Sequence, residues 1–221
     1  MQDPSCTDIT GRALEFLHWQ GLDTAHPAVR SGIEFIKRSQ EPEGCFFGRW
    51  GVNYIYGTWQ SIVGPIMCGA DPSEDWLQRA GAWLRSVQKP DGSFGESANS
   101  YLDASEMGRG PSTPSQTAWG AMAMLAVHGP DDDGVLRALE WLADTQLDDA
   151  AAADPSANPD GDPAGSWCET EFTGTGFPKV FYLRYHLYRL YFPAMALGRF
   201  ISAVERAGND GAVESRPTFS T

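Results

Sequence analysis

The 221-residue sequence is short of several features that define common protein classes. Its longest nearly apolar runs, at residues 121–127 and 192–197, fall far below the roughly 20 residues that a membrane-spanning helix needs. Four scattered cysteines form no C-x-x-C pair and are too sparse for a disulfide framework. Only 16 Lys and Arg stand against 29 Asp and Glu, and the formal charge of −13 argues against a nucleic-acid partner.

Motifs for cofactors and signals are also missing. The sequence contains no H-E-x-x-H, phosphate-binding loop, Rossmann glycine pattern or nucleophile elbow, so we expect no cofactor and no metal. The start Met-Gln-Asp-Pro has neither the basic nor the apolar region of a signal peptide. We therefore expect a cytoplasmic chain with reduced cysteines, whose contact with a membrane is at most peripheral.

What the sequence does contain is an internal repeat, over residues 28–50, 77–96 and 135–169. Each copy reads as a helix, a glutamine, a Pro- or acid-containing turn with glycine, and an aromatic residue. The glutamines are Gln40, Gln88 and Gln146. A glutamine at the end of one helix can bond backbone groups at the end of a neighbouring helix, while the glycine takes the tight turn. The repeats therefore predict structural staples between helices, not reacting groups.

Apolar helices are predicted between these amphipathic ones, at residues 57–68, 114–127 and 181–204, with one more at residues 8–19. Alternation of one-faced and nearly all-round apolar helices is typical of an α/α barrel or toroid, with the apolar helices inside. No segment alternates with period two over a sustained length. We predict an all-α fold, namely a partial barrel of about half the full ring.

This partial barrel is expected to form one domain over residues 1–204. Within it, residues 147–163 form an insertion rich in Asp, Ala and Pro, which we expect to be a solvated surface loop. Residues 205–221 are predicted to be a disordered polar tail.

Several long motifs give the sequence a family resemblance. They are F-G-R-W-G-V-N-Y-I-Y-G-T-W (residues 47–59), Q-K-P-D-G-S-F-G-E (88–96), G-P-S-T-P-S-Q-T-A-W (110–119) and E-F-T-G-T-G-F-P-K-V-F-Y-L-R-Y-H-L-Y-R-L-Y-F-P (171–193). Together they resemble the C-terminal part of squalene-hopene cyclases, bacterial triterpene cyclases with QW repeats. The likeness runs from about residue 3 to about residue 200 but corresponds to only the last third of such an enzyme.

The resemblance implies two α/α barrels around an apolar cavity and a monotopic position on a membrane. It also implies that squalene is protonated and cyclised through carbocations to hopene. The family's protonating acid is the middle aspartate of a D-x-D-D motif that precedes the matched region, and this sequence does not contain that motif. The acidic run Asp131–Asp133 lies between Gly129-Pro130 and Gly134, and is expected to be a turn that caps a helix.

Phe177, Phe181, Tyr185 and Tyr188 are spaced by four, four and three residues, which predicts one stripe on one helix face. From spacing alone, a packed core stripe is the simpler interpretation. The resemblance implies instead that Phe177 and Phe181 stabilise cationic intermediates and that Tyr185 and Tyr188 line the cavity. Aromatic faces suit that task because their quadrupole attracts positive charge.

The other candidate residues lie in two further segments. The resemblance places Trp50 in the lining of the cavity, although it could simply end the first repeat, and Tyr56 near the protonating acid. Asp8 and Arg12 are spaced so that their side chains can meet on one helical turn, which alone predicts a weak surface pair. The resemblance makes Arg12 the hydrogen-bond partner of the protonating acid and Asp8 its acidic neighbour.

Two functional hypotheses follow. In the first, the chain is the C-terminal segment of a squalene-hopene-type cyclase, supplying part of the cavity for squalene or a similar polyprenyl substrate. It would then be inactive alone and would need an N-terminal cyclase chain or domain for the acid, on a membrane surface. In the second, it is a noncatalytic helical-repeat interaction module, or a relic of such an enzyme that keeps the fold without turnover. An independent α/α-barrel hydrolase is disfavoured because no paired carboxylates stand out on the apolar helices.

Overall fold

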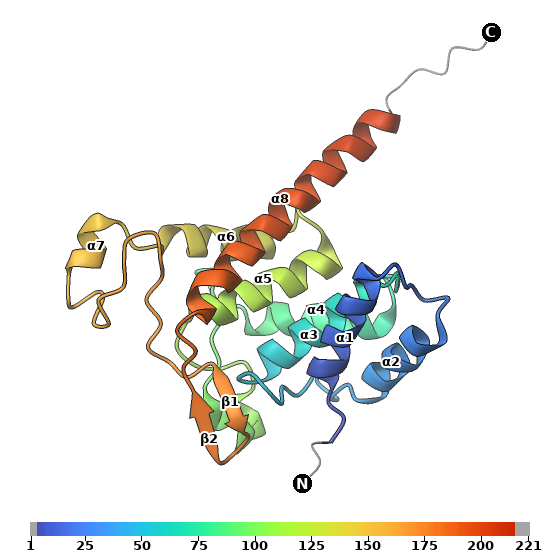
Figure 1. The fold of residues 1–221 in the computed structure, drawn as a ribbon, viewed down its shortest axis with the longest axis horizontal. Coiled ribbons are helices and arrows are strands. Elements are labelled where there is room, and N and C mark those ends of the chain that lie inside the picture. The colour runs from blue at the N-terminus through green and yellow to red at the C-terminus, as the bar shows by residue number, and fades with distance from the viewer. Residues whose placement is uncertain (1–3, 215–221) are drawn as a thin grey trace.

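The structure is a computed structural model, and it describes residues 4–214. Its elements follow the chain in the order α1 (Thr7–Trp19), α2 (Pro27–Arg38), α3 (Tyr54–Met67), α4 (Asp75–Val87), the 3-10 turns η1 (Ala98–Tyr101) and η2 (Ala104–Glu106), α5 (Pro114–His128), α6 (Asp133–Asp144), α7 (Asp149–Ala153), β1 (Gly174–Phe177), β2 (Phe181–Leu183) and α8 (Tyr188–Glu214) (Figure 1).

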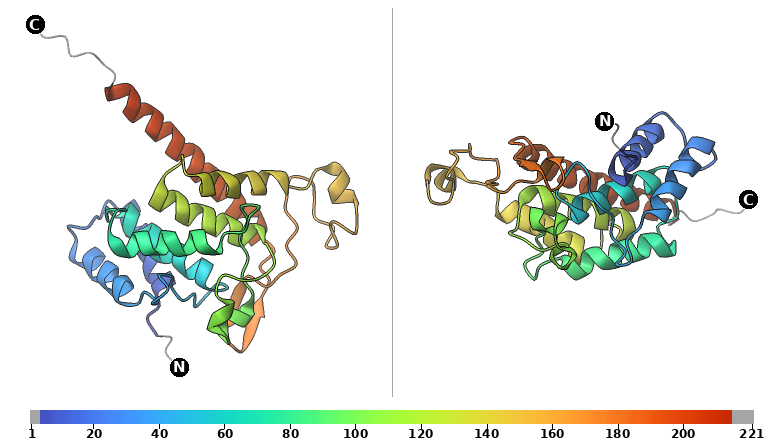
Figure 2. Two further views of the ribbon diagram at one scale, coloured as in Figure 1. Left: turned by 180° about the vertical axis from the view of Figure 1, so that it is seen from behind. Right: turned by 90° about the horizontal axis from the view of Figure 1, so that it is seen from below.

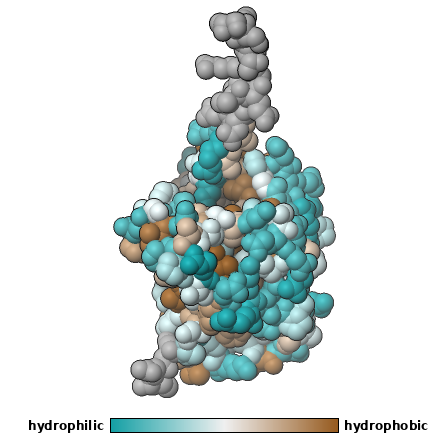
Figure 3. Space-filling model, turned by 90° about the vertical axis from the view of Figure 1, so that its right-hand side faces the viewer, coloured by the Kyte–Doolittle hydropathy of each residue, from teal (hydrophilic) through white to brown (hydrophobic). Residues whose placement is uncertain are grey.

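Helices α1, α3, α5 and α8 pack side by side in that order and form an inner layer, and α2, α4 and α6 lie outside it. The central inner helices are buried on all sides: every residue from Tyr54 to Pro65 of α3 is buried. The outer helices bury one face only, as α2 does with Val29, Ile33 and Ile36. The side of the molecule that carries α2 is accordingly mostly polar, with scattered apolar patches (Figure 3). The chain is thus the predicted partial α/α barrel.

Helices α1 and α3 cross at glycines. A Cβ added at Gly11 would lie 1.9 Å from the carbonyl oxygen of Gln60, and one added at Gly64 would lie 2.1 Å from the carbonyl oxygen of Gly11. Any side chain at either position would separate the two backbones. The close crossing brings the first turns of α1 near the loop that precedes α3.

The first repeat forms the predicted staple. The Nε2 of Gln40 donates to the carbonyl oxygen of Gly44 in its own turn, at 2.8 Å, and to that of Trp76 in the first turn of α4, at 2.7 Å. Gly44 takes the turn with φ of 99°, a conformation that favours glycine. One amide therefore ties the end of α2 to the start of α4.

The second repeat does the same, and the third only in part. The Nε2 of Gln88 donates to Gly92 at 2.9 Å and to Gly134, in the first turn of α6, at 2.7 Å. The Nε2 of Gln146 donates to Gly165 at 2.8 Å. Within the described residues, Gln146 bonds no second helix.

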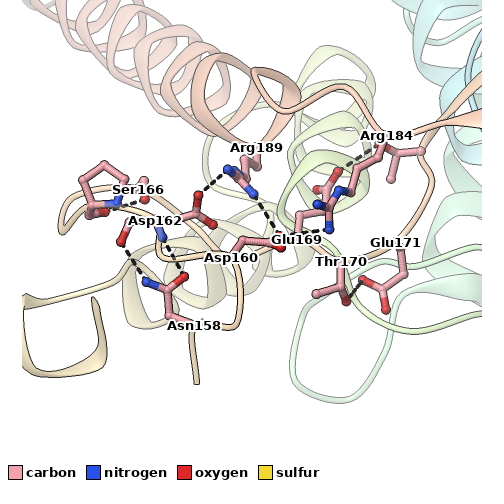
Figure 4. A network of polar contacts seen from close by, with 11 residues as sticks. Asn158, Asp160, Asp162, Ser166, Glu169, Thr170, Glu171, Arg184 and Arg189 are labelled. Atoms are coloured by element: carbon pink, nitrogen blue, oxygen red, sulfur yellow. Dashed lines mark hydrogen bonds and ion pairs between the residues drawn. The ribbon is translucent and has the colours of Figure 1, made fainter. Parts of the chain in front are cut away.

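The insertion is more ordered than its composition predicts. It includes α7 and projects from the body beyond the end of α6 (Figure 2). Asn158 is only 2% exposed and Asp162 only 7%. Asp162 pairs with Arg189 at the start of α8, and Asp160 pairs with Arg184 at 2.9 Å (Figure 4). These charge-assisted bonds anchor a segment that has little apolar surface of its own.

The prediction of one aromatic helix stripe is wrong. Phe177 ends β1 and Phe181 begins β2 in an antiparallel two-stranded hairpin, and α8 begins only at Tyr188. Tyr185 lies in the connection between β2 and α8. Two features of the sequence oppose the helix. The glycines of T-G-T-G-F have low helix propensity. Pro178 has no backbone N–H and cannot continue a helical hydrogen-bond ladder. The turn itself places Lys179 at φ of 68°.

The C-terminal region also differs from the prediction. Residues 205–214, assigned to a disordered tail, continue α8. The rest of the predicted tail, residues 215–221, lies outside the described residues. Within residues 4–214, no helix combines the length and the apolar character that crossing a bilayer requires.

Candidate aromatic site

The inner layer is lined by a cluster of aromatic rings. Trp59 of α3 and Trp119 of α5 stack, with ring centroids 5.9 Å apart and planes 6° apart. Phe192 of α8 presents an edge contact to both, at 5.3 and 5.2 Å. The ring centroid of Tyr188 lies 6.0 Å from that of Trp119. We did not predict Trp59, Trp119 and Phe192 as site residues, although each lies inside a motif of the family resemblance.

Tyr56 belongs to this cluster. Its ring centroid lies 5.0 Å from that of Trp119, and the residue is 7% exposed. A Cβ added at Gly51 would lie 2.4 Å from the ring, so glycine is required where Tyr56 packs on the preceding loop. Burial, reinforced by the negative charge of Asp8, raises the pKa of Tyr56 above its ordinary value. The phenol therefore stays protonated and can donate a hydrogen bond.

The hairpin carries a second aromatic group. The rings of Phe177 and Phe181 lie 5.6 Å apart in an edge contact, and the residues are 40% and 45% exposed. Tyr185, 42% exposed, stacks on Tyr188 at 4.7 Å. Since Tyr188 also contacts Trp119, Tyr185 is continuous with the inner cluster.

Arg49 brings Trp50 and Phe177 together. Its guanidinium carbon lies 4.5 Å from the ring centroid of Trp50 and 5.2 Å from that of Phe177. Its Nη1 also donates to the carbonyl oxygen of Gly176 at 3.1 Å. We did not predict Arg49 as a site residue, although it stands in F-G-R-W of the quoted motif. The two aromatic faces therefore already share an internal cation.

The predicted surface pair of Asp8 and Arg12 does not form. Asp8 is fully buried, and its Oδ2 accepts from the backbone N–H groups of Arg49 at 2.8 Å and Trp50 at 2.9 Å. Its Oδ1 accepts from Ile9 N–H, 2.9 Å away. Two donors on the loop before α3 turn the carboxylate away from its own helix face. Asp8 thus fixes the backbone at Trp50.

Arg12 has another carboxylate partner. It pairs with Glu15 one turn along α1, and its guanidinium lies 5.4 Å from the ring centroid of Trp59. Glu15 also pairs with Arg199 of α8. This bridge ties the first and last inner helices and holds a cation against the aromatic cluster.

Two buried carboxylates complete the polar groups around the inner helices. An oxygen of Glu96 accepts from the backbone N–H of Ile55 at the start of α3, and one of Glu169 accepts from that of Ser115 at the start of α5, each at 2.9 Å. The positive ends of these helices favour the negative charge. Burial nevertheless raises the pKa of both carboxyl groups. Neither carboxylate stands out in the sequence, because the backbone groups that it binds are more than 40 residues away.

The described residues include no group of three or more His, Cys, Asp or Glu side chains placed to hold a metal ion. A hollow of about 650 Å³ lies at the other end of the inner helices, lined by residues such as Met67, Met122 and Met195. Another, of about 670 Å³, lies beside α4 and η2 and includes Trp83. Neither hollow is lined by any of the eight predicted site residues.

The geometry defines a class: a partial α/α toroid of glutamine-stapled repeats, with an aromatic inner surface. A family model for the squalene-hopene cyclase C-terminal domain matches residues 1–202. The chain therefore belongs to that family.

Curated relatives agree with this assignment. A squalene–hopene cyclase of Alicyclobacillus acidocaldarius is 41% identical over 204 residues, which cover 92% of this chain and 30% of the relative. One from Bradyrhizobium diazoefficiens is 39% identical over 201 residues, 90% of this chain and 28% of the relative. Dammaradiene synthase of Dryopteris crassirhizoma is 37% identical over 223 residues, 90% of this chain and 30% of the relative. The chain thus corresponds to a C-terminal segment of a terpene cyclase and spans less than a third of these relatives.

Proposed function

We propose that the chain supplies the C-terminal part of the aromatic cavity in which a squalene-hopene-type cyclase converts squalene to hopene, a step of hopanoid biosynthesis. The matched relatives are named as cyclases of this kind. Such a reaction needs an acid, surfaces that stabilise a moving positive charge, and exclusion of water. This chain contributes the second and part of the third.

The observation that carries the proposal is the aromatic cluster of the inner layer, which Tyr185 extends through Tyr188, together with the separate ring pair Phe177 and Phe181 on the hairpin. In our proposal, Trp50, Phe177, Phe181, Tyr185 and Tyr188 face the substrate. The exposed fractions of Phe177, Phe181 and Tyr185, between 40% and 45%, leave ring surface that a substrate could contact. A desolvated aromatic face stabilises a cation by about 2 kcal/mol.

We assign Asp8, Arg12 and Tyr56 to the surroundings of an acid that the rest of the cyclase provides. A guanidinium beside a carboxyl group favours its ionised form and lowers its pKa, which makes it a stronger acid. Arg12 is suited to this because Glu15 and Trp59 hold it at the aromatic cluster. Tyr56 offers a protonated hydroxyl beside them, and Asp8 holds the backbone at Trp50.

The remaining part of the cyclase is then the partner, either as a separate chain or as the upstream part of a longer one. We further propose a cytoplasmic location with peripheral contact to a membrane, from which an apolar polyene such as squalene would be drawn.

The test combines this chain with the upstream part of the Alicyclobacillus acidocaldarius relative that it does not match. The purified chain alone should form no hopene from squalene, and the combined parts should form it, as measured by gas chromatography and mass spectrometry. Phe181→Ala should reduce the yield at least tenfold. Phe16→Ala, at a 61% exposed position on α1, is the matched control and should not.

A second candidate function, that of a noncatalytic helical-repeat module, is favoured by the internal cation between Trp50 and Phe177. Association of the two parts without any cyclised product would support it. Hopene formed by the chain alone would contradict the proposed division of labour.

A further inference from the structure

The two complete staples in this chain hold the next outer helix in the same way. Besides bonding the carbonyl oxygen of its second residue, the glutamine meets an arginine five residues into that helix. The Nη2 of Arg79 donates to the Oε1 of Gln40, and that of Arg137 donates to the Oε1 of Gln88 at 3.4 Å. The Nε2 and the Oε1 of each glutamine side chain therefore both bind the next outer helix.

Each of these arginines is held by an aspartate at the first position of its helix. Arg79 pairs with Asp75 at 3.2 Å, and Arg137 pairs with Asp133 at the same distance. The pairs are spaced i, i+4 along α4 and α6, so both helices start with the pattern Asp-x-x-x-Arg. The aspartate orients the guanidinium toward the glutamine.

The turn glycines complete the contact. A Cβ added at Gly44 would lie 2.7 Å from the carbonyl oxygen of Arg79, and one added at Gly92 would lie 2.4 Å from that of Arg137. The backbone of the next helix therefore rests directly on each turn. We call the glutamine and its turn glycine a socket.

The third socket, Gln146 and Gly165, has the same components without the helix. Gly165 has the same type of backbone, with φ of 82°, but nothing lies within 4 Å of a Cβ added there. Gln146 is exposed and uses one donor for Gly165. In the described part of the chain, the insertion between these two residues does not fill the socket.

We propose that the Gln146–Gly165 socket binds the first turn of an α-helix, supplied from outside the described chain, that begins with Asp-x-x-x-Arg. The backbone carbonyl of the helix's second residue accepts from Gln146, its arginine donates to the Gln146 carbonyl oxygen, and its backbone rests on Gly165. The socket follows from this chain's own repeats. That the helix belongs to the remaining part of a cyclase rests on the function proposed above.

One difference between the two filled sockets and the third indicates which residue precedes the first aspartate of the incoming helix. In the filled sockets the residue three positions before the glutamine is basic and pairs with an acidic residue just before the next helix. Lys37 pairs with Glu74 at 2.6 Å, and Arg85 pairs with Asp132. The equivalent residue before Gln146 is Ala143. The incoming helix is therefore expected to have an uncharged residue, such as serine, before its first aspartate.

The first experiment probes the socket with a helical peptide, stabilised by a hydrocarbon bridge, that copies residues 130–144 with Asp132→Ser. Nuclear magnetic resonance of the isotope-labelled chain follows the side-chain amide of Gln146 and the backbone amide of Gly165. Both signals should shift, and the peptide should bind at least tenfold more tightly than a matched peptide with Arg137→Ala. Absence of shifts at millimolar peptide, or equal binding of the two peptides, would overturn the proposal.

Variants of the chain provide the specificity control. Gln146→Leu removes both the donor and the acceptor of the side-chain amide and should weaken peptide binding at least tenfold. Gln20→Leu makes the same chemical change at an exposed position at the end of α1 and should leave binding unchanged. Both should keep the melting temperature of the parent chain, because both side chains are exposed. Equal binding by the two variants would contradict the assigned role of Gln146.

The second experiment separates the socket from the proposed function. The chain and its two variants are coexpressed with the upstream part of the Alicyclobacillus acidocaldarius relative, and copurification is measured. Gln146→Leu should reduce copurification and Gln20→Leu should not. If the substitution of Gln146 leaves copurification unchanged, the socket proposal is wrong, while the proposed cyclase function is unaffected. If the peptide binds as expected but the two cyclase parts never associate, the socket stands and the proposed function fails.

Discussion

Trp59 and Trp119, from neighbouring inner helices, stack with their ring planes only 6° apart. This stack is the centre of the inner layer, because Tyr56 and Phe192 press their edges against it from α3 and α8. The aromatic inner surface therefore has a buried part at the stack and a partly exposed part at the hairpin.

Phe192→Ala should be among the most destabilising substitutions in α8. Phe192 is 3% exposed and contacts both tryptophans, so its loss should cost about 3–5 kcal/mol in the free energy of unfolding. Phe177→Ala, at a 40% exposed position, should cost about 1 kcal/mol. Urea unfolding followed by circular dichroism measures both. Equal losses would show that the hairpin is packed as tightly as the stack.

Gly92→Ala should destabilise the chain more than Gly161→Ala. Both glycines have positive φ, 89° and 70°, so each substitution carries backbone strain of about 1–2 kcal/mol. Only at Gly92 does the added Cβ also meet a backbone oxygen, that of Arg137 at 2.4 Å. The fall in melting temperature should be at least twice as large for Gly92→Ala. Similar falls in melting temperature would mean that the backbone at Arg137 moves away from the added Cβ with no loss of stability.

Glu15→Gln should weaken the link between α1 and α8. The variant leaves Arg12 and Arg199 without a negative partner at this point, and we expect a loss of about 1 kcal/mol, since Arg12 is partly solvated. High salt should reduce the difference from the parent chain. The control is Glu140→Gln, exposed on α6, with an expected change below about 0.5 kcal/mol. A loss that is independent of salt would point to packing instead of charge.

Glu169→Gln should change how stability depends on pH. Burial raises the pKa of Glu169 in the folded chain, so the folded state binds its proton more readily than the unfolded state does. The parent chain therefore loses stability as pH rises from the unfolded pKa of about 4.3 through the raised folded pKa. The variant has no carboxyl group at this position to titrate, so its stability relative to the parent should increase as the pH rises through this range.

Chemical unfolding at several pH values between about 4.5 and 8 measures that difference. Glu140→Gln is again the control and should follow the parent curve. If the stability of Glu169→Gln and that of the parent depend on pH in the same way, the pKa of Glu169 is not raised in the folded chain.

The staples and the layer order could be predicted because one short pattern recurs along the chain. Each of Gln40 and Gln88 lies four residues before its turn glycine, and amphipathic spacing marks the outer helices. The repetition indicated that each turn joins neighbouring helices, although the residues that accept from the glutamines on those helices lie 36 and 46 positions away. Membership of the family could be inferred because the quoted motifs occur together and in order.

The hairpin and the buried carboxylates could not be predicted in the same way. Phe177, Phe181 and Tyr185 have helical spacing, and that periodicity outweighed the glycines and Pro178 around them. Asp8 could reach Arg12 along its own helix, but the donors that hold it are on a loop 41 and 42 residues away. Contacts at such separation depend on the assembled fold, and spacing along the chain does not encode them.

The position of Arg49 has a consequence for any carbocation that develops near the hairpin. Its guanidinium already occupies the space between Trp50 and Phe177, where two ring faces would otherwise be open to a guest. An incoming carbocation could reach those two rings only past this guanidinium. Turnover at that point therefore requires the arginine side chain to rotate aside, or the hydrocarbon to run along Phe181 and Tyr185 instead.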